Sequence, residues 1–421
     1  MAYLRPTALD AYRAYLLLEG GKAALFSMIF TASSIYQVSV AGLTPLQLVL
    51  VGTMLEAAVL VFEVPTGVVA DVYSRRLSII IGMVLVGLGF ILEGSIPLFS
   101  SILLAQVIWG LGYTFTSGAT QAWITDEIGE AAAGQAFLRS AQIGQIAALA
   151  GIAAAVLIGG MAVSLPIVSG GALMILLGVF MALFMPETGF TKAVQGERST
   201  WQNLVHTFRQ GVGMVRRRPA LLTILGIGLF YGLYSEGYDR LWTKQMVDGI
   251  GFPALAGLAP VAWLGMMRAG GMLLSAGATG IIRPRIRTDD HHSVAHALTW
   301  ITGCLVAGLV VFALVGSFVP ALLAFWLIYI ARSLIEPLYT AWVNQRLDAR
   351  VRATVISMSG QVDAIGQIVS GPLVGLVGSL FSVQAAIALS GLILSPVLLL
   401  FGRAERMEIE PEMESSPPVE D

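Results

Sequence analysis

Two acidic residues stand inside long apolar segments with no opposite charge within a turn of their own helix. Glu56 lies in LQLVLVGTMLEAAVLVFEVPT, and Asp363 lies in SGQVDAIGQIVSG. Removal from water favours the neutral form of a carboxyl group, so such an acid can take up and release a proton. We expect one of the two to carry a coupling proton. The alternative is a basic partner on another helix, such as Arg268.

More charged side chains gather in the apolar segments near residues 231 and 331. Glu236 and Asp239 are further candidates for proton coupling, or they belong to an outer gate or a hydrated helix end. Arg332 and Glu336 are one helical turn apart, so they either neutralise each other or bind substrate. These residues need helices that hold them away from bulk water.

The composition predicts that those helices lie in a membrane. Hydrophobic residues make up 56% of the 421 residues, charged residues make up 12%, and the mean hydropathy is +0.81. Soluble globular proteins carry about 25% charged residues. The chain has a single cysteine, Cys304, which excludes a disulfide framework and a cysteine-based metal site.

Twelve apolar stretches have about the length that crosses a bilayer. They are centred near residues 27, 56, 87, 112, 150, 175, 231, 270, 305, 331, 366 and 392. The predicted fold class is therefore an all-α membrane protein with twelve transmembrane helices in two pseudo-symmetric six-helix bundles. The segments QAWITDE and TAWVNQR occupy corresponding positions of the two halves, and such internal repeats are typical of secondary transporters.

The polar intervals predict the domain boundaries. Residues 1–188 form the first bundle, 189–218 a cytoplasmic linker with an amphipathic surface helix, 219–406 the second bundle, and 407–421 a disordered acidic tail. Basic residues concentrate in alternate loops, as in YSRR, MVRRRP and IIRPRIR. The positive-inside rule then places both termini in the cytoplasm and the chain in the inner (cytoplasmic) membrane.

The short loop GVVADVYSRR, between the second and third stretches, carries a recognisable motif. Its residues Gly67, Asp71, Arg75 and Arg76 resemble the loop motif of the major facilitator superfamily, and the topology, linker and repeat extend the resemblance over nearly the whole chain. The resemblance implies a cytoplasmic gate. Orienting charges at the membrane surface are the alternative interpretation.

The resemblance also implies partners for this gate motif. Asp71 would face the N-terminal end of the eleventh helix, where the positive end of the helix dipole favours an anion. Arg75 or Arg76 would pair with an acid at the end of the fourth helix, either Asp126 or Glu127.

The fourth stretch, GLGYTFTSGATQAW, is similar to that of bacterial drug-exporter-like members. Many such exporters carry an arginine where this chain has Gln106, which leaves the mode of proton antiport open. The resemblance places the central cavity among helices 1, 4, 7 and 10, and aromatic walls suit an amphipathic or lipophilic cation, although rings also serve ordinary packing. The candidate cavity residues are Gln106, Trp109, Tyr113, Tyr231, Tyr234, Arg268, Tyr329, Arg332, Glu336 and Tyr339.

Other kinds of site find little support in the sequence. The segment TDDHHSVAH has acids and histidines, but its two adjacent histidines cannot easily share one metal ion. No nucleotide-binding or nucleophile motif stands between a strand and a helix, so we expect no enzyme activity, no cofactor, no metal site and no nucleic-acid partner.

The leading prediction is a monomeric, proton-coupled exporter of a small lipophilic or amphipathic molecule, working by alternating access. A transporter of a lipid, sugar or metabolite, possibly uncoupled or an importer, is the first alternative. A transport-inactive membrane sensor or scaffold is the second.

Overall fold

The computed structural model describes residues 9–192, 219–254, 257–286, 290–346 and 349–406, and every regular element in these ranges is a helix. This agrees with the predicted all-α class. The predicted surface helix of the linker and the acidic tail lie outside the described residues, as does the start of TDDHHSVAH.

The first half of the chain contributes α1 (Ala11–Ile35), η1 (Tyr36–Val40), α2 (Pro45–Val72), α3 (Arg75–Ser95), α4 (Phe99–Thr116), α5 (Ala119–Ile128), α6 (Glu130–Gly159) and α7 (Ser164–Phe184). The second half contributes α9 (Pro219–Lys244), η2 (Gln245–Ile250), α10 (Pro260–Ile282), η3 (Arg283–Arg285), α11 (His291–Leu314), α12 (Phe318–Arg346), α13 (Ala349–Leu380), α14 (Val383–Leu394) and α15 (Pro396–Arg406).

Local sequence signals explain where several helices begin. Thr44 caps α2, with Pro45 in the first turn and Gln47 completing a capping box. Ser74 caps α3 and Ser382 caps α14, each accepting a hydrogen bond from a backbone N–H of the first turn.

Ten helical segments in the described residues are long and apolar enough to cross a membrane. They cover ten of the twelve predicted stretches. The other two correspond to α9 and α10, which have 26 and 23 residues but are not among those ten. The chain is thus a multi-span membrane protein, and the twelve-span count stays a prediction.

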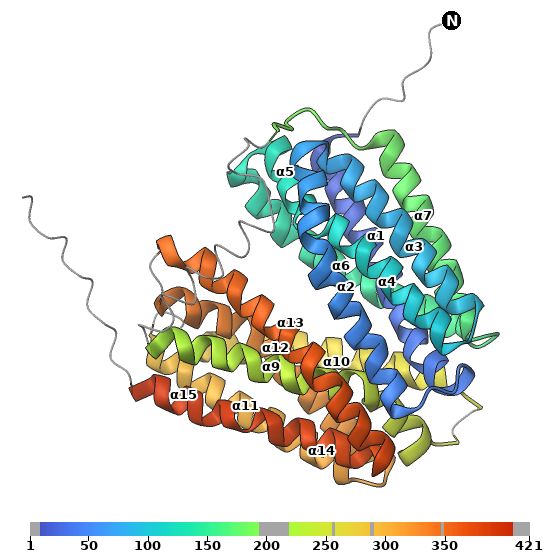
Figure 1. Ribbon diagram of the computed structural model, residues 1–421, viewed down its shortest axis with the longest axis vertical. Coiled ribbons are helices and arrows are strands. Elements are labelled where there is room, and N and C mark those ends of the chain that lie inside the picture. The colour runs from blue at the N-terminus through green and yellow to red at the C-terminus, as the bar shows by residue number, and fades with distance from the viewer. Residues whose placement is uncertain (1–8, 193–218, 255–256, 287–289, 347–348, 407–421) are drawn as a thin grey trace, which may run out of the picture.

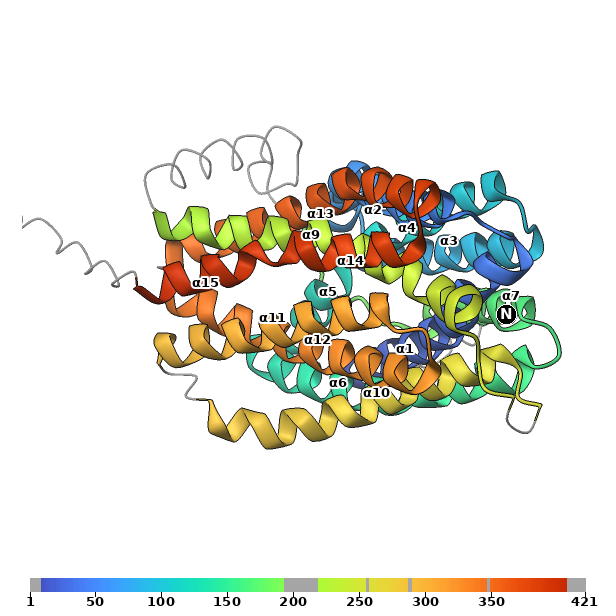
Figure 2. The ribbon, with the colours of Figure 1, turned by 90° about the horizontal axis from the view of Figure 1, so that it is seen from below.

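The helices of each half pack mainly on one another. Figure 1 shows α1–α7, hereafter the N-terminal helices, on one side and α9–α15, the C-terminal helices, on the other. Helices α2 and α13 pack together across the division, as do α6 and α10, and Figure 2 shows the long helices of both groups from another side.

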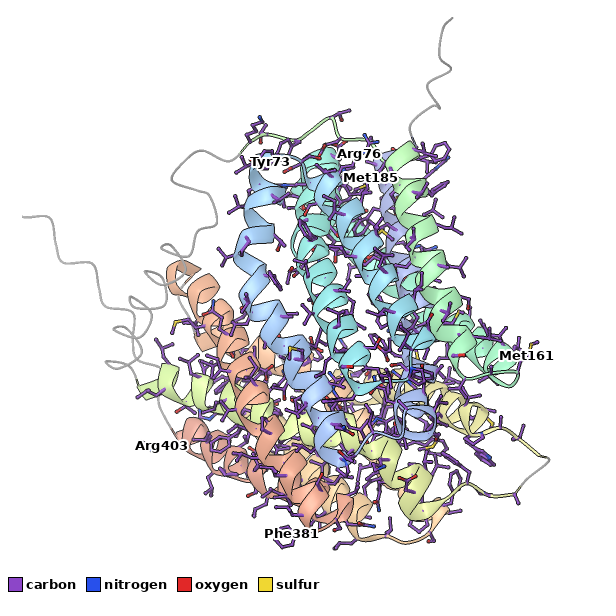
Figure 3. The ribbon with its side chains drawn as sticks, turned by 45° about the vertical axis from the view of Figure 1, so that its right-hand side comes forward. Tyr73, Arg76, Met161, Met185, Phe381 and Arg403 are labelled. Carbon is purple, nitrogen blue, oxygen red and sulfur yellow. The ribbon has the colours of Figure 1, made fainter. Side chains whose placement is uncertain are left out.

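Glycines let α2 and α13 approach closely. A Cβ atom added at Gly371 would lie 2.1 Å from Oγ1 of Thr53, and one at Gly375 would lie 3.0 Å from Cα of Leu46. We call this region the α2–α13 contact. Figure 3 places Phe381, which follows α13, far from Arg76 at the other end of the N-terminal helices.

Candidate functional site

A cavity of about 650 Å³ lies between the two groups of helices. The N-terminal helices contribute one wall from α1, η1, α2, α3 and α4, and the C-terminal helices contribute the other from α9, α10 and α12. We call it the central cavity. Its charged lining residues are Glu93, Asp239, Arg240, Arg268, Arg332 and Glu336, and its aromatic ones are Phe30, Phe90, Trp109, Tyr238, Trp242, Phe325 and Tyr329.

The N-terminal wall contains a buried acid that the sequence analysis missed. Glu93 has no exposed surface and accepts hydrogen bonds from Ser33, from Gln37 at 2.9 Å and from Gln106 at 3.1 Å. Gln106 in turn accepts a 2.8 Å hydrogen bond from Nε1 of Trp109. All of these donors are neutral, so hydrogen bonds rather than a salt bridge hold the carboxyl group in place.

The sequence does not indicate that Glu93 is buried, because it lies in the last turn of α3, where a charged residue commonly marks a helix end at the membrane surface. A usable signal existed in the polar residues Ser33, Gln37 and Gln106, which occur in otherwise apolar segments. Only the packing of α1, η1 and α4 around the end of α3 shows that they meet.

The C-terminal wall holds its charges in ion pairs. The two terminal guanidinium nitrogens of Arg332, Nη1 and Nη2, donate to the two carboxylate oxygens of Asp239, which links α12 to α9. Arg332 therefore pairs with Asp239 rather than with Glu336, because Asp239 reaches it from the facing helix. The side chain of Glu336 is left exposed and lines the cavity.

A second ion pair lies on α9 itself. Nε of Arg240 contacts Oε2 of Glu236 at 3.2 Å, and the side chain of Glu236 is only 4% exposed. A Cβ atom at Gly52 would lie 2.1 Å from that carboxylate oxygen, so the pair rests against α2 of the other group. This pair is part of the interface between the two groups and not a freely hydrated helix end.

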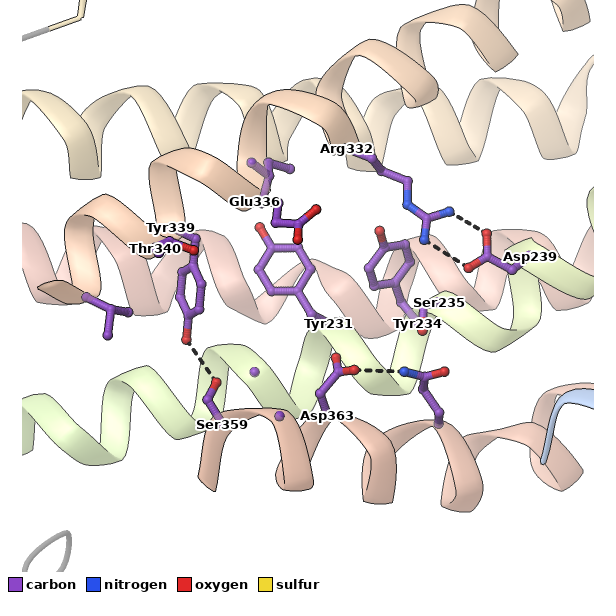
Figure 4. Close-up of a pocket in the computed structure, with 15 residues that line it drawn as sticks. Tyr231, Tyr234, Ser235, Asp239, Arg332, Glu336, Tyr339, Thr340, Ser359 and Asp363 are labelled. Atoms are coloured by element: carbon purple, nitrogen blue, oxygen red, sulfur yellow. Dashed lines mark hydrogen bonds and ion pairs between the residues drawn. The ribbon is translucent and has the colours of Figure 1, made fainter. Parts of the chain in front are cut away.

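A second cavity, of about 420 Å³, lies among α9, α12 and α13 (Figure 4). Tyr231, Tyr234 and Tyr339 line it together with Asp363, which accepts a 2.7 Å hydrogen bond from Gln367. We call it the tyrosine cavity. Asp239, Arg332 and Glu336 line both cavities, so the Arg332–Asp239 pair stands where the two spaces adjoin.

The two acids singled out first in the sequence lie on the packed helices α2 and α13, but only one of them lines either of the two cavities. Asp363 faces the tyrosine cavity, whereas Glu56 is half-buried on α2 and lines neither of these two cavities. Arg268 pairs with neither acid; its Nη1 donates to the backbone carbonyl of Phe30 at 2.7 Å. Arg268 is therefore not the basic partner of either acid.

The predicted aromatic residues fall into three positions. Trp109 and Tyr329 line the central cavity, where the Trp109 ring stacks on Phe90 at 5.3 Å between centroids. Tyr231, Tyr234 and Tyr339 line the tyrosine cavity. Tyr113 is 44% exposed and lines neither cavity.

The loop motif lies at the end of the N-terminal helices, next to the segment that follows α7. Arg75 contacts Asp126 at 2.6 Å, which is one of the pairings that the resemblance implies. The backbone N–H of Arg76 donates to Glu187 at 2.9 Å, and Glu127 accepts hydrogen bonds from the Thr188 side chain and backbone. The proposed partner of Asp71 and the role of Gly67 stay predictions.

Comparisons with known proteins agree with this architecture. A family model described as Major Facilitator Superfamily matches residues 20–360. A Bacillus subtilis (strain 168) protein, named uncharacterized MFS-type transporter YxaM, is 24% identical over 358 residues, which cover 84% of this chain and 86% of that protein.

Solved structures share the fold at low identity. The nucleoside transporter NupG has a TM-score of 0.75 and 15% identity, covering 95% of this chain and 100% of that chain. A bacterial homolog of the human lysosomal transporter Spinster, in an inward-facing and unoccupied conformation, has a TM-score of 0.70 and 15% identity, covering 95% and 98%. A POT family transporter in complex with a thioalcohol-conjugated peptide has a TM-score of 0.69 and 16% identity, covering 94% and 96%.

Proposed function

The chain belongs to the Major Facilitator Superfamily of transporters, and we propose that it moves a small amphipathic organic solute through the central cavity, by alternating access and with protons as the coupling ion. The observation that carries the proposal is the central cavity itself, which both groups of helices line with rings and charged side chains. Charged residues inside membrane-spanning helices are costly, and they mark pathways for substrates and ions.

Alternating access needs one side of the cavity to be closed while the other can open. We propose that the twelve predicted spans form two pseudo-symmetric bundles, and that the α2–α13 contact closes the outer side. The loop motif with Arg75 and Arg76 then lies in the cytoplasm with both termini, in the inner membrane, and the protein faces inward. We propose that the protein transports as a monomer.

Asp363 is the acid that we assign to proton coupling. It faces a cavity, its hydrogen-bond donor is the neutral Gln367, and the Arg332–Asp239 pair lines the same cavity. A proton on Asp363 would change the charge beside this pair, and the pair lines both the tyrosine cavity and the central cavity. Glu56, which faces neither cavity, is the second candidate.

We propose outward transport of the multidrug type because residues 110–123 resemble those of drug exporters. The mixture of aromatic and charged lining residues supports an amphipathic substrate more than a purely lipophilic one. Transport of a lipid, sugar or metabolite is the competing proposal, which a solute panel resolves.

The test is proton flux in proteoliposomes. Purified protein is reconstituted with a pH-sensitive dye inside and no imposed gradient, and lipophilic cations, neutral drugs, lysolipids and organic anions are added one at a time. We expect a substrate-triggered pH change that Asp363→Asn abolishes. Glu63→Gln is the matched control, because Glu63 is an exposed acid on α2.

Two outcomes would contradict parts of the proposal. Full pH responses in both Asp363→Asn and Glu56→Gln would refute the assignment of the coupling acid. Solute movement without any pH change would refute proton coupling, and failure of the whole panel to move would count against transport of such solutes.

A further inference from the structure

One arginine of the central cavity differs from the other two in its ion pairing. Arg332 has Asp239 and Arg240 has Glu236, so two of the three cavity arginines are paired. Within the described part of the chain, no carboxylate forms an ion pair with the third, Arg268. Among the residues that the structure describes, its side chain donates to the Phe30 carbonyl alone, which uses one of the five N–H donors of the guanidinium group.

The remaining acids of the cavity are not placed to neutralise Arg268. Glu93 is enclosed by its hydroxyl and amide donors. Trp326 donates to the carbonyl of Met267 at 3.0 Å, which sets the level of Arg268 along α12. Glu336 lies about 15 Å further along that helix at the usual rise of about 1.5 Å per residue.

A guanidinium group in a membrane-embedded cavity is costly unless something compensates its charge. Its planar set of donors matches the two oxygens of a carboxylate or the oxygens of a phosphate. The side chain lines the space through which a solute would pass, and its contact with Phe30 joins α10 to α1 across the two groups. A bound anion at this position would therefore contact the interface that moves during transport.

The neighbouring rings indicate what the anionic group is attached to. Phe30 packs against Phe90 at 5.7 Å and Trp109 at 6.0 Å between ring centroids, and all three line the central cavity. Tyr329 lines it from α12. A flat apolar body can pack on these rings while its charged group reaches the guanidinium.

We propose that Arg268 is an anion-binding subsite and that the substrate is an organic anion, with a carboxylate or phosphate group on an aromatic or apolar body. This inference rests on the proposed function, because it names the substrate class of the same cavity. It also replaces the lipophilic cation expected from the rings alone, since an unpaired guanidinium repels a cation.

Four probes of one ring size test the charge requirement: benzoate, phenyl phosphate, benzyl alcohol and benzylamine. Their binding to the full-length protein in detergent is followed by the shift of its thermal unfolding midpoint over a concentration series. We expect stabilisation by one or both anions and none by the alcohol or the amine at equal concentrations. Preference between the two anions identifies the anionic group.

The variants test the residue. Arg268→Gln should weaken anion binding by at least about tenfold, the effect expected for loss of a charge-assisted pair. Arg268→Lys keeps the positive charge but lacks the planar set of guanidinium donors, so it should retain part of the affinity for the anion. It also shows whether loss of binding in Arg268→Gln reflects misfolding. Arg139→Gln, which removes an exposed arginine on α6, should bind like the wild type.

Equal stabilisation by benzyl alcohol, no stabilisation by either anion, or unchanged anion binding in Arg268→Gln would overturn the inference. Transport of cations or neutral drugs without anion binding would remove the subsite and leave the proposed function standing. Anion binding without movement of any solute would do the reverse.

Discussion

The two walls of the central cavity hold their buried charges in different ways. The N-terminal wall surrounds Glu93 with neutral hydroxyl and amide donors, whereas the C-terminal wall uses the ion pairs of Arg332 with Asp239 and Arg240 with Glu236. A hydrogen-bonded acid keeps its place when its charge changes, because the donors can rearrange slightly. An ion pair loses its main attraction when one partner is neutralised. The C-terminal wall is therefore the better candidate for the part that switches.

The largest expected effect comes from breaking the more buried ion pair. Arg240→Gln leaves Glu236 without its cation and should destabilise the protein by about 3 kcal/mol, as is usual when one partner of a buried pair is removed. Thermal unfolding in detergent measures this. The double variant Glu236→Gln/Arg240→Gln should recover most of the loss. A loss of stability in the double variant equal to the sum of the losses in the two single variants would contradict a coupled pair.

The next effect tests the N-terminal wall. Glu93→Leu leaves the donors of Ser33, Gln37 and Gln106 without their acceptor and should cost about 2 kcal/mol. Glu93→Gln keeps an acceptor of the same size and should cost less than about 1 kcal/mol. If Glu93→Gln were as destabilising as Arg240→Gln, the two walls would not differ in how they hold their buried charges.

A third change acts on the α2–α13 contact. Gly371→Leu would place side-chain atoms where Thr53 stands, and overpacking of this kind costs about 1–3 kcal/mol. We expect the contact to loosen and the outer side to open. The readout is maleimide labelling of Leu48→Cys in a Cys304→Ser background, since Leu48 lines the central cavity and is 2% exposed.

The control for this experiment is Gly402→Leu, where an added Cβ atom meets no neighbour within 4 Å. Labelling should rise in Gly371→Leu and stay at the wild-type level in the control. Equal labelling in both variants would mean that the α2–α13 contact does not limit access to the cavity.

The smallest expected effects compare helix caps in the two groups. Ser74 accepts from the N–H of Leu77 at 2.9 Å and donates to Glu187 at 2.6 Å, whereas Ser382 accepts from the N–H of Ala385 at 3.0 Å. Ser382→Ala should cost about 1 kcal/mol, the usual value of an N-cap. Ser74→Ala should cost more because it also breaks the bond to Glu187, and equal unfolding midpoints would contradict a role of that bond.

The candidate site could be predicted in part. The apolar lengths located the helices because they depend on local sequence alone, and the resemblance of the loop motif implied the contact of Arg75 with Asp126. The pairings inside the cavities, for which no motif gave a lead, were missed. Arg332 has an acid one turn away on its own helix, yet it binds Asp239 from α9, since nothing in the spacing along one helix says which side chains face it from another.

The sequence by itself determined the solvent, the helical class and the family of this protein. Apolar stretches of about 20 residues cross a bilayer as helices, and the motif residues are close together in the chain. The tertiary structure decided which charges are paired and which face a cavity, and it revealed the burial of Glu93 and the lack of a carboxylate partner for Arg268 within the described ranges. Burial and pairing depend on contacts between segments that are far apart in the sequence, so they exist only after the helices have packed.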